Sequence, residues 1–236
     1  MTKEAHKSFS HVTEWVFDLD NTLYPRHCDL FSQIDKQMTD YMMKLTGLEF
    51  DAARKLQKDL YRDHGTTLRG LMTTRGIDPH EFLDHAHDID YTQLPSNPQL
   101  GDMLKKLPGR KLIYTNGSVS HAENTLNALG IEGVFDEIFD IVASEFIPKP
   151  LNDPFNKFLA DHGVDGSRAA MFEDLPRNLK PAKDAGMVTV LVSPQPGTNF
   201  RGEAWELLDQ DHEHIDHHTD DLDTLIGAIV EHVVVA

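Results

Sequence analysis

One stretch decides the fold, and it reads Trp15-Val16-Phe17-Asp18-Leu19-Asp20-Asn21-Thr22-Leu23-Tyr24. Its apolar run ends in two carboxylates, Asp18 and Asp20, which alternation along a strand places on one face. Two such charges repel each other unless a cation lies between them or one takes up a proton. Mg²⁺ is the natural partner of clustered carboxylate oxygens, and open α/β sheets bind ligands at the carboxyl ends of their strands. The stretch predicts a buried strand with a metal site at its end, although a solvated Asp-Asn turn would have the same pattern.

The composition is that of a globular protein with an acidic surface. The 236 residues suit one domain plus a smaller one, or a single large α/β domain. Hydrophobic residues make up 39% of the chain, enough for a core. The formal net charge of −17 repels phosphate backbones and anionic membranes. We therefore expect a small-molecule partner and neither nucleic acid nor membrane.

Cysteine content and the amino-terminal sequence bear on the cellular compartment. Cys28 is the only cysteine, so no intrachain disulfide can form, which is typical of a reducing compartment. The first 14 residues lack the apolar stretch of a signal peptide, and no stretch approaches the length of a membrane span. We expect a cytoplasmic protein.

Strand and helix patterns alternate over most of the chain. After Trp15–Leu19, the predicted strands are Lys111–Tyr114, Glu137–Ala143, Ala169–Phe172 and Val188–Val192. The predicted helices between and beside them are Gln99–Leu107, Val119–Leu129, Pro154–His162 and Arg177–Ala185. Such alternation predicts a doubly wound parallel sheet with crossover helices, in which Trp15–Leu19 is the first and central strand.

Residues 25–94 interrupt this alternation. Apolar residues recur at helical spacing from Leu30 to Leu45, a second helix is predicted over Phe50–His64, and a third from Asp78 to about His87. The sequence therefore predicts a helical domain at 25–94, inserted into an α/β core formed by residues 1–24 and 95–236.

The carboxyl-terminal part carries histidines among acids. They occur in Asp209–His214 and as His217-His218, without the spacing of a closed metal site. We expect a solvated surface there, followed by a last helix over Leu222–Val233.

Polar groups follow three further predicted strands. Thr115-Asn116-Gly117-Ser118 offers a hydroxyl and backbone N–H groups at a helix start, a neutral cradle for phosphate, although Asn-Gly is also a common turn. Lys149 is held between two prolines, which restrict its backbone. Glu173 and Asp174 add oxygen ligands suited to Mg²⁺. Together with Asp18 and Asp20, these groups predict phosphoryl transfer through a carboxylate nucleophile.

The four sites resemble the four motifs of the haloacid dehalogenase superfamily, in order: Phe17–Leu23, Thr115, Lys149 and Glu173-Asp174. The helical insertion resembles the cap that one large branch of the superfamily carries after the first motif. More narrowly, the segments Leu23–Pro25, Tyr61–Leu71 and Phe172–Leu179 resemble the pyrimidine 5′-nucleotidase-like branch. The resemblance implies a Rossmann-like core and a Mg²⁺-dependent phosphomonoesterase.

The resemblance also implies roles for single residues. Asp18 is the expected nucleophile, and Asp20 is the general acid and base. Thr115, Asn116 and Lys149 are expected to bind phosphate. The implied metal ligands are Asp18, the carbonyl of Asp20 and Asp174, with Glu173 as an inner- or outer-sphere acid and Asn178 beside it. Dehalogenases of the superfamily lack the second aspartate, so Asp20 favours phosphate chemistry.

The substrate is predicted less sharply than the reaction. The narrower resemblance implies that the substrate is a nucleoside 5′-monophosphate, with pyrimidine nucleotides preferred. Thr67 and Arg69 are the candidate residues for this specificity. Alternatively, Thr66-Thr67 only caps the next helix and Arg69 pairs with a surface acid. A sugar-phosphate or phosphoglycolate phosphatase and a phosphomutase would share the same motifs. A non-catalytic binding module would be expected to lack one of the motif residues.

Overall fold

A computed structural model describes residues 8–195 and 213–233 of the chain. Its core is a parallel sheet with the strand order β3-β2-β1-β4-β5-β6. The strands are β1 Glu14–Phe17, β2 Arg110–Tyr114, β3 Glu137–Phe139, β4 Ala169–Glu173, β5 Val188–Val192 and β6 His217–Thr219. The predicted fold class is confirmed, with β1 in the middle of the sheet. The strand order reverses between β1 and β4, where open sheets of this kind bind ligands.

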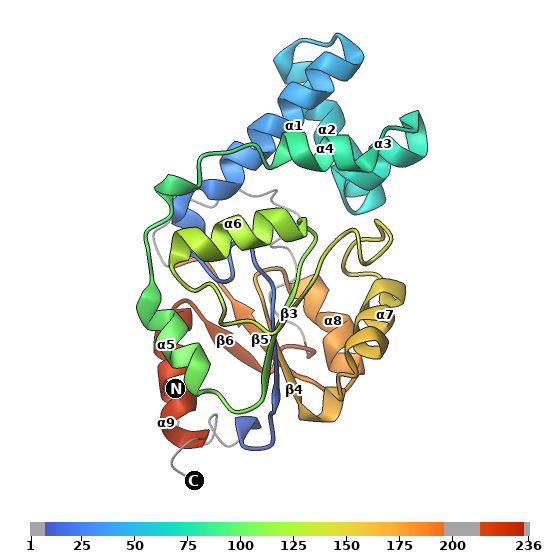
Figure 1. The fold of residues 1–236 in the computed structure, drawn as a ribbon. Coiled ribbons are helices and arrows are strands. Elements are labelled where there is room, and N and C mark those ends of the chain that lie inside the picture. Colours follow the sequence, from blue (N-terminus) through green and yellow to red (C-terminus); the bar gives the residue numbers. More distant parts are fainter. Residues whose placement is uncertain (1–7, 196–212, 234–236) are drawn as a thin grey trace.

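Helices cover both faces of the sheet (Figure 1). The side chains of Trp15 and Phe17 pack with α5, α6 and α9, whereas Val16 points to the opposite face, where it packs with α7 and α8. Because both faces are covered, β4 and β5 are buried along their whole length. The helices are α5 Pro98–Lys106, α6 Val119–Leu129, α7 Asn152–His162, α8 Pro176–Asp184 and α9 Leu222–Val233.

Four helices between β1 and α5 form a separate lobe above the sheet, called the helical cap below (Figure 1). They are α1 Leu30–Thr46, α2 Phe50–His64, α3 Thr67–Arg75 and α4 Pro79–Ala86. The cap has an apolar cluster in which Met42, Leu71 and Phe82 are buried, and Ile141 of the core segment after β3 belongs to the same cluster. Short 3-10 turns occur at Arg26–Cys28, Tyr91–Gln93 and Gly166–Arg168. The helix α3 was given no range by the sequence analysis and was expected only under the alternative in which Thr66-Thr67 caps a helix; Gly65 and Thr66 separate it from α2.

Two other expectations were wrong in detail. The strand predicted over Glu137–Ala143 ends at Phe139, because the Asp140 side chain accepts hydrogen bonds from the backbone N–H groups of Val119 and Ala143 and turns the chain. His217-His218 is not only solvated surface. It belongs to β6, and His217 contacts Ser8 and the ring of Phe9. The predicted acidic stretch at 209–212 lies outside the described residues.

Among the described residues, no helix is both long enough and apolar enough to cross a membrane.

Gly109 permits the close approach of the chain segments that begin β1 and β2. Its φ is +81°, and a Cβ there would lie 2.0 Å from the backbone oxygen of Thr13. We expect Gly109→Ala to lower the free energy of unfolding by more than the ~1–2 kcal/mol of left-handed strain alone. Urea unfolding followed by circular dichroism measures the loss.

Gly133→Ala is the matched control, because Gly133 has a φ of +72° and nothing within 4 Å of the added Cβ. It should lose only the strain energy. Equal losses in the two variants would show that the approach to Thr13 does not constrain the sheet.

Candidate active site

The carboxyl ends of β1 and β4 bring the first and fourth predicted motifs together. Phe17 pairs with Phe172 in the sheet, and the backbone N–H of Asp18 donates to the carbonyl of Phe172 at 2.9 Å. The next residues along the two strands, Asp18 and Glu173, are therefore neighbours. Both carboxylates are buried.

Lys149 lies between these two acids. Its Nζ donates to Asp18 Oδ1 at 2.6 Å, to Glu173 Oε1 at 2.8 Å and to the carbonyl of Tyr114 at 2.9 Å. All three protons of the ammonium thus have acceptors, and the neighbouring carboxylates raise the pKa of the Lys149 side chain although burial opposes this. The predicted lysine is charged, buried and fixed.

Three carboxylates converge on one point that suits a divalent cation. Single oxygens of Asp18, Glu173 and Asp174 all lie within 4.8 Å of one another. Burial raises the pKa of Asp18 to about 7, with Lys149 acting against it and Glu173 and Asp20 adding to it. Burial also raises the pKa of Asp174 well above its usual value. A hard cation bound there would relieve this excess of negative charge, so the residues fit Mg²⁺.

The acids differ in how far the protein already satisfies them. Both oxygens of Glu173 accept protein donors: Lys149 and the amide of Asn178 at Oε1, and the backbone N–H of Leu175 at Oε2. Asp174 accepts from Arg26 at 2.6 Å, through Oδ2. Asn178 Oδ1 is buried and has no hydrogen-bond partner within the described part of the chain. Both oxygens of Glu173 are thus occupied by hydrogen bonds from the protein, whereas one oxygen of Asp174 remains available to a metal ion.

The second predicted motif forms a tight turn before α6. The hydroxyl of Thr115 accepts from the backbone N–H of Gly117 at 2.9 Å, and Ser118 caps the helix by accepting from the N–H of His121. Asn116 Oδ1 accepts from the backbone N–H of Lys149 at 2.9 Å. The turn therefore joins the second motif to the third, and a Cβ on Gly117 would lie 3.4 Å from the Thr115 hydroxyl.

Asp20 has partners that the sequence analysis did not identify. Its Oδ1 accepts from the Tyr24 hydroxyl at 2.5 Å and from His121 Nε2 at 2.8 Å. Burial raises the pKa of Asp20, but the charge of His121 and the two hydrogen bonds outweigh it, so that the pKa is lowered. The sequence could have pointed to His121, because it lies in the first turn of the helix that follows the predicted phosphate cradle. It belongs to the buried face of that helix, with Ala122 and Thr125.

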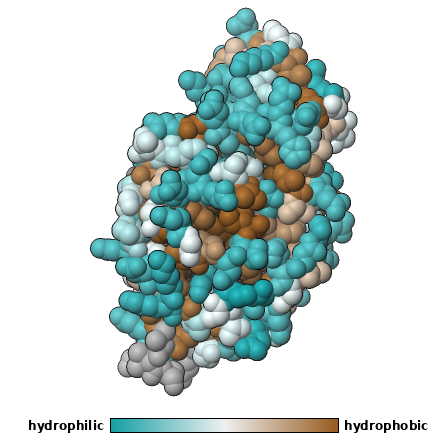
Figure 2. All heavy atoms as spheres, viewed as in Figure 1, coloured by the Kyte–Doolittle hydropathy of each residue, from teal (hydrophilic) through white to brown (hydrophobic). Residues whose placement is uncertain are grey.

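A cavity of about 330 Å³ connects this site to the helical cap. Its floor includes Asp18, Asp20, Thr115 and Lys149, and its roof comes from α1, α2, α3 and α4. The apolar roof residues are Phe31, Ile34, Met38, Leu68, Phe82, Leu83 and Ala86, and the polar ones include Ser32, Asp35, Arg54, Gln57, Lys58, Tyr61, Thr66 and Thr67. Hydrophilic residues cover most of the visible outer surface of the cap (Figure 2).

The two candidate specificity residues lie differently. Thr66 caps α3, its side chain accepting from the backbone N–H of Arg69, as the structural alternative predicted. Thr67 is buried and lines the cavity. Arg69 is not among the described residues that line it, since two positions along a helix turn its side chain about 200° away from Thr67. The predicted contact of Arg69 with substrate is therefore not supported.

The cap contacts the core through Tyr61 and Arg177. The guanidinium of Arg177 on α8 donates to the Tyr61 hydroxyl on α2 at 2.7 Å and lies 5.4 Å from the centre of its ring. This contact joins α2, whose Tyr61 lines the cavity, to α8 of the core. The local sequence of neither residue could have shown it.

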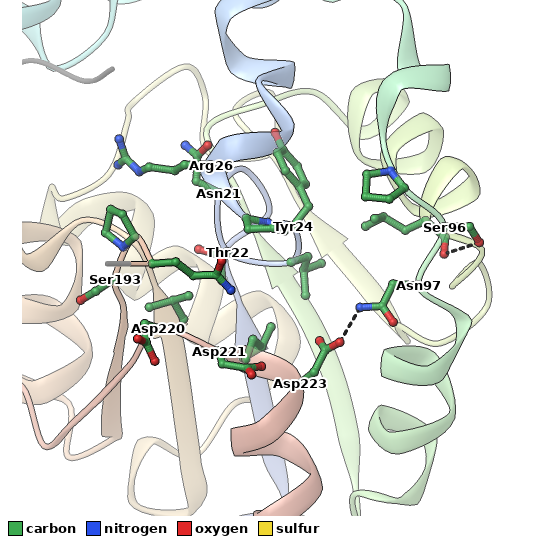
Figure 3. A pocket seen from close by; sticks show the side chains of 18 residues that line it. Asn21, Thr22, Tyr24, Arg26, Ser96, Asn97, Ser193, Asp220, Asp221 and Asp223 are labelled. Atoms are coloured by element: carbon green, nitrogen blue, oxygen red, sulfur yellow. Dashed lines mark hydrogen bonds between the residues drawn. The ribbon is translucent and has the colours of Figure 1, made fainter. Parts of the chain in front are cut away.

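A second cavity, of about 280 Å³, shares Asn21 and Arg26 with the first (Figure 3). Its acids serve local structure: Asp223 accepts from the Asn97 amide at 2.7 Å, and Asp221 accepts from the N–H and hydroxyl of Thr224. None of the predicted catalytic residues line it.

A protein-family model describes what this fold and site define. Residues 16–186 match the model of the haloacid dehalogenase-like hydrolases. The match covers well over half of the chain and includes all four motifs, so the chain belongs to this family of hydrolases.

Comparison with single proteins adds curated relatives and many similar folds. The chain is 26% identical over 214 residues to "Phosphate metabolism protein 8" of Saccharomyces cerevisiae, covering 83% of this chain but only 65% of the length of that protein. A haloacid dehalogenase-type phosphatase from Thermococcus onnurineus has a similar fold, with a TM-score of 0.60, 18% identity, and coverage of 91% of this chain and 96% of the other. An L-2-haloacid dehalogenase aligns with a TM-score of 0.58 and 13% identity over 92% and 99% of the two chains. The fold alone thus does not separate phosphatase from dehalogenase.

The convergence of three acids predicts that Mg²⁺ stabilises the folded protein. At ~100 times its dissociation constant the ion should add about 2.7 kcal/mol, which corresponds to a rise in Tm of roughly 5–10 °C. Thermal unfolding with and without MgCl₂ measures the shift.

Asp174→Asn should remove most of this shift. Asp216→Asn, which makes the same change in charge at an acid paired with Lys183, should keep it. An equal shift in all three proteins would mean that the ion does not bind at the three acids.

Proposed function

We propose that the protein is a Mg²⁺-dependent phosphomonoesterase that works through an aspartyl-phosphate on Asp18 and acts on nucleoside 5′-monophosphates, with pyrimidine nucleotides preferred. The observation that carries the proposal is the position of Asp18. Its carboxylate contacts Lys149 and the Thr22 hydroxyl, lies within reach of Asp174, and opens onto the cavity beneath the cap.

In the first step an oxygen of Asp18 attacks the phosphorus. The new bond from phosphorus to Asp18 forms as the bond to the leaving oxygen breaks, and Asp20 gives its proton to that oxygen. Lys149 and the Thr115 turn provide positive charge and N–H groups for the phosphoryl oxygens. The dianionic phosphate bound beside Asp20 favours its protonated form, against the partners that lower its pKa.

In the second step water replaces Asp18 on phosphorus. Asp20, now ionised, accepts a proton from the water, phosphate leaves, and Asp18 is restored. A lowered pKa suits Asp20 to this role.

The Mg²⁺ ion would be held by Asp18, Asp174 and the backbone carbonyl of Asp20, and would supply charge neutralisation at the phosphoryl group. Glu173 orients Lys149 and Asn178 through the hydrogen bonds described above. The protein's own cations near these acids, Lys149 and Arg26, each contact one ligand carboxylate directly.

Two observations favour the nucleotide over a smaller ester. The cavity of about 330 Å³ lies within the range of about 300–1,000 Å³ that is usual for ligand pockets, more than phosphoglycolate needs. The roof of the cavity contains apolar side chains that could pack against a nucleotide base. It also contains a cluster of polar side chains, in which Asp35 accepts hydrogen bonds from Arg54, Gln57 and Lys58. The name of the yeast relative fits phosphate chemistry.

A hydrolysis panel tests the proposal. With excess Mg²⁺, the protein should release phosphate from pyrimidine nucleoside 5′-monophosphates faster than from sugar phosphates or phosphoglycolate, and chelation should stop it. Asp18→Asn should retain less than ~1% of the activity, because an amide is no nucleophile, while its circular dichroism stays unchanged.

Full activity in chelator would contradict the metal assignment, and an active Asp18→Asn would contradict covalent catalysis. A preference for a small phosphate ester would leave a phosphatase but reject the nucleotide as substrate.

The roof of the cavity provides a second test, on helix α2. Lys58 lines the cavity, whereas Lys55 is exposed and pairs with Asp59. Losing a donor to the base should cost ~1–3 kcal/mol, so Lys58→Met should lower kcat/KM for the nucleotide at least ~5-fold relative to p-nitrophenyl phosphate.

Lys55→Met should leave that ratio unchanged. Thr67→Val, which removes a hydroxyl at the cavity, should lower it in the same direction. If Lys58→Met lowers kcat/KM equally for both substrates, then Lys58 on α2 does not contact the leaving group.

A further inference from the structure

We propose that His121 and Tyr24 are positioning residues that hold one oxygen of Asp20, so that the other faces the phosphate cradle. This inference rests on the proposed phosphatase reaction, because it concerns the group that protonates the leaving oxygen. It assigns to two residues outside the four motifs a task that the motifs alone do not perform.

Both hydrogen bonds to the Asp20 carboxylate go to the same oxygen. Tyr24 and His121 donate to Oδ1 from opposite parts of the chain, one from the turn after β1 and one from the first turn of α6. Among the described residues, Oδ2 accepts no hydrogen bond from a side chain. With two donors fixed on Oδ1, rotation of the carboxylate would break two hydrogen bonds to a charged acceptor, which are stronger than neutral ones.

The other oxygen lies beside the turn that is expected to hold the phosphate. A Cβ built on Gly117 would lie 3.0 Å from Cδ2 of His121, 3.4 Å from the Thr115 hydroxyl and 3.8 Å from Asp20 Oδ2. Because Gly117 has no side chain, Asp20 Oδ2 and the Thr115 hydroxyl can both lie close to this point of the turn. A proton carried on Oδ2 is the one that can reach the leaving oxygen of an ester held in the cradle.

His121 is itself fixed on every side. Its ring is fully buried, its Nδ1 lies 3.0 Å from the Tyr91 hydroxyl, and it stacks on His87 with ring centres 4.4 Å apart and planes 9° from parallel. His87 in turn contacts the Ser118 hydroxyl at 3.0 Å. Burial lowers the pKa of His87 to about 3, so the ring under His121 is neutral and does not repel it.

These supporting residues place a further constraint on Asp20. His87 ends α4 and Tyr91 lies in the 3-10 turn beyond it, both in the segment by which the chain returns from the cap to the core. The direction of the Asp20 carboxylate therefore depends on the position of that segment as well as on the core. A substrate that shifts this segment of the cap would therefore also change the direction of the Asp20 carboxylate.

The test compares a poor leaving group with a good one. An alkyl phosphate needs a proton on its leaving oxygen, whereas p-nitrophenyl phosphate needs little help. We expect His121→Ala and Tyr24→Phe each to lower kcat for the alkyl ester at least ~10-fold more than kcat for the aryl ester. His121→Gln, whose amide can reach the place of Nε2, should recover most of the loss.

His162→Gln is the control for loss of a packed imidazole, since the His162 ring packs edge-on against Phe139 and at a tilt against Phe158. It should leave the ratio of the two rates unchanged. Tyr24→Phe keeps the buried ring and removes only the hydroxyl. It therefore tests the proposal even if the His121 variants do not fold.

Equal losses on the two esters in Tyr24→Phe and in His121→Ala, with a fully active wild-type protein, would overturn the positioning role and leave the phosphatase assignment standing. A wild-type protein that hydrolyses neither ester with Mg²⁺ would overturn the proposed function, and the positioning role with it.

Discussion

The ammonium group of Lys149 lies 2.6 Å from Asp18 and 2.8 Å from Glu173, and the arrangement of the site depends on this buried contact. Removing one partner would leave a buried charge without compensation, which costs ~3–5 kcal/mol. Through Asn116, which accepts from its backbone N–H, Lys149 is also tied to the phosphate cradle. Lys149 therefore connects the ends of β1 and β4 with the segment after β2. The three carboxylates still outnumber the two cations that contact them, Lys149 and Arg26, and leave a place for a metal ion.

The core and the cap divide the tasks of this site. In the proposed reaction the core supplies the reacting carboxylates, on strands whose register is set by the sheet, as in the pairing of Phe17 with Phe172. The cap forms the roof of the cavity, with Tyr61 bound to Arg177, and presents the cluster of polar side chains that includes Asp35. His121 connects the two, because it contacts Asp20 on one side and the return segment of the cap on the other. In this proposal, the residues for the reaction and those for selectivity lie on different elements that are in contact through His121.

The sequence predicted most where chemistry and local pattern coincide. Asp18 and Asp20 end a short apolar strand, and the acid pair at residues 173 and 174 ends another, so β1, β4 and the cluster of acids could be foreseen from alternation and charge. Contacts made across long separations could not. The stacking of His121 on His87 joins α6 to the end of α4, and the placement of Arg69 away from the cavity depends on the rotation of a nine-residue helix.

The central claim is that Asp18 becomes phosphorylated during turnover. The most direct measurement quenches the protein while it hydrolyses a phosphate ester with Mg²⁺, reduces any acyl phosphate with borohydride, and locates the product by peptide mass spectrometry. The account predicts homoserine at position 18 in turning-over protein, and unchanged aspartate there when substrate is left out. Continued phosphate release with Asp18 unmodified, or with the reduced residue at another position, would contradict it.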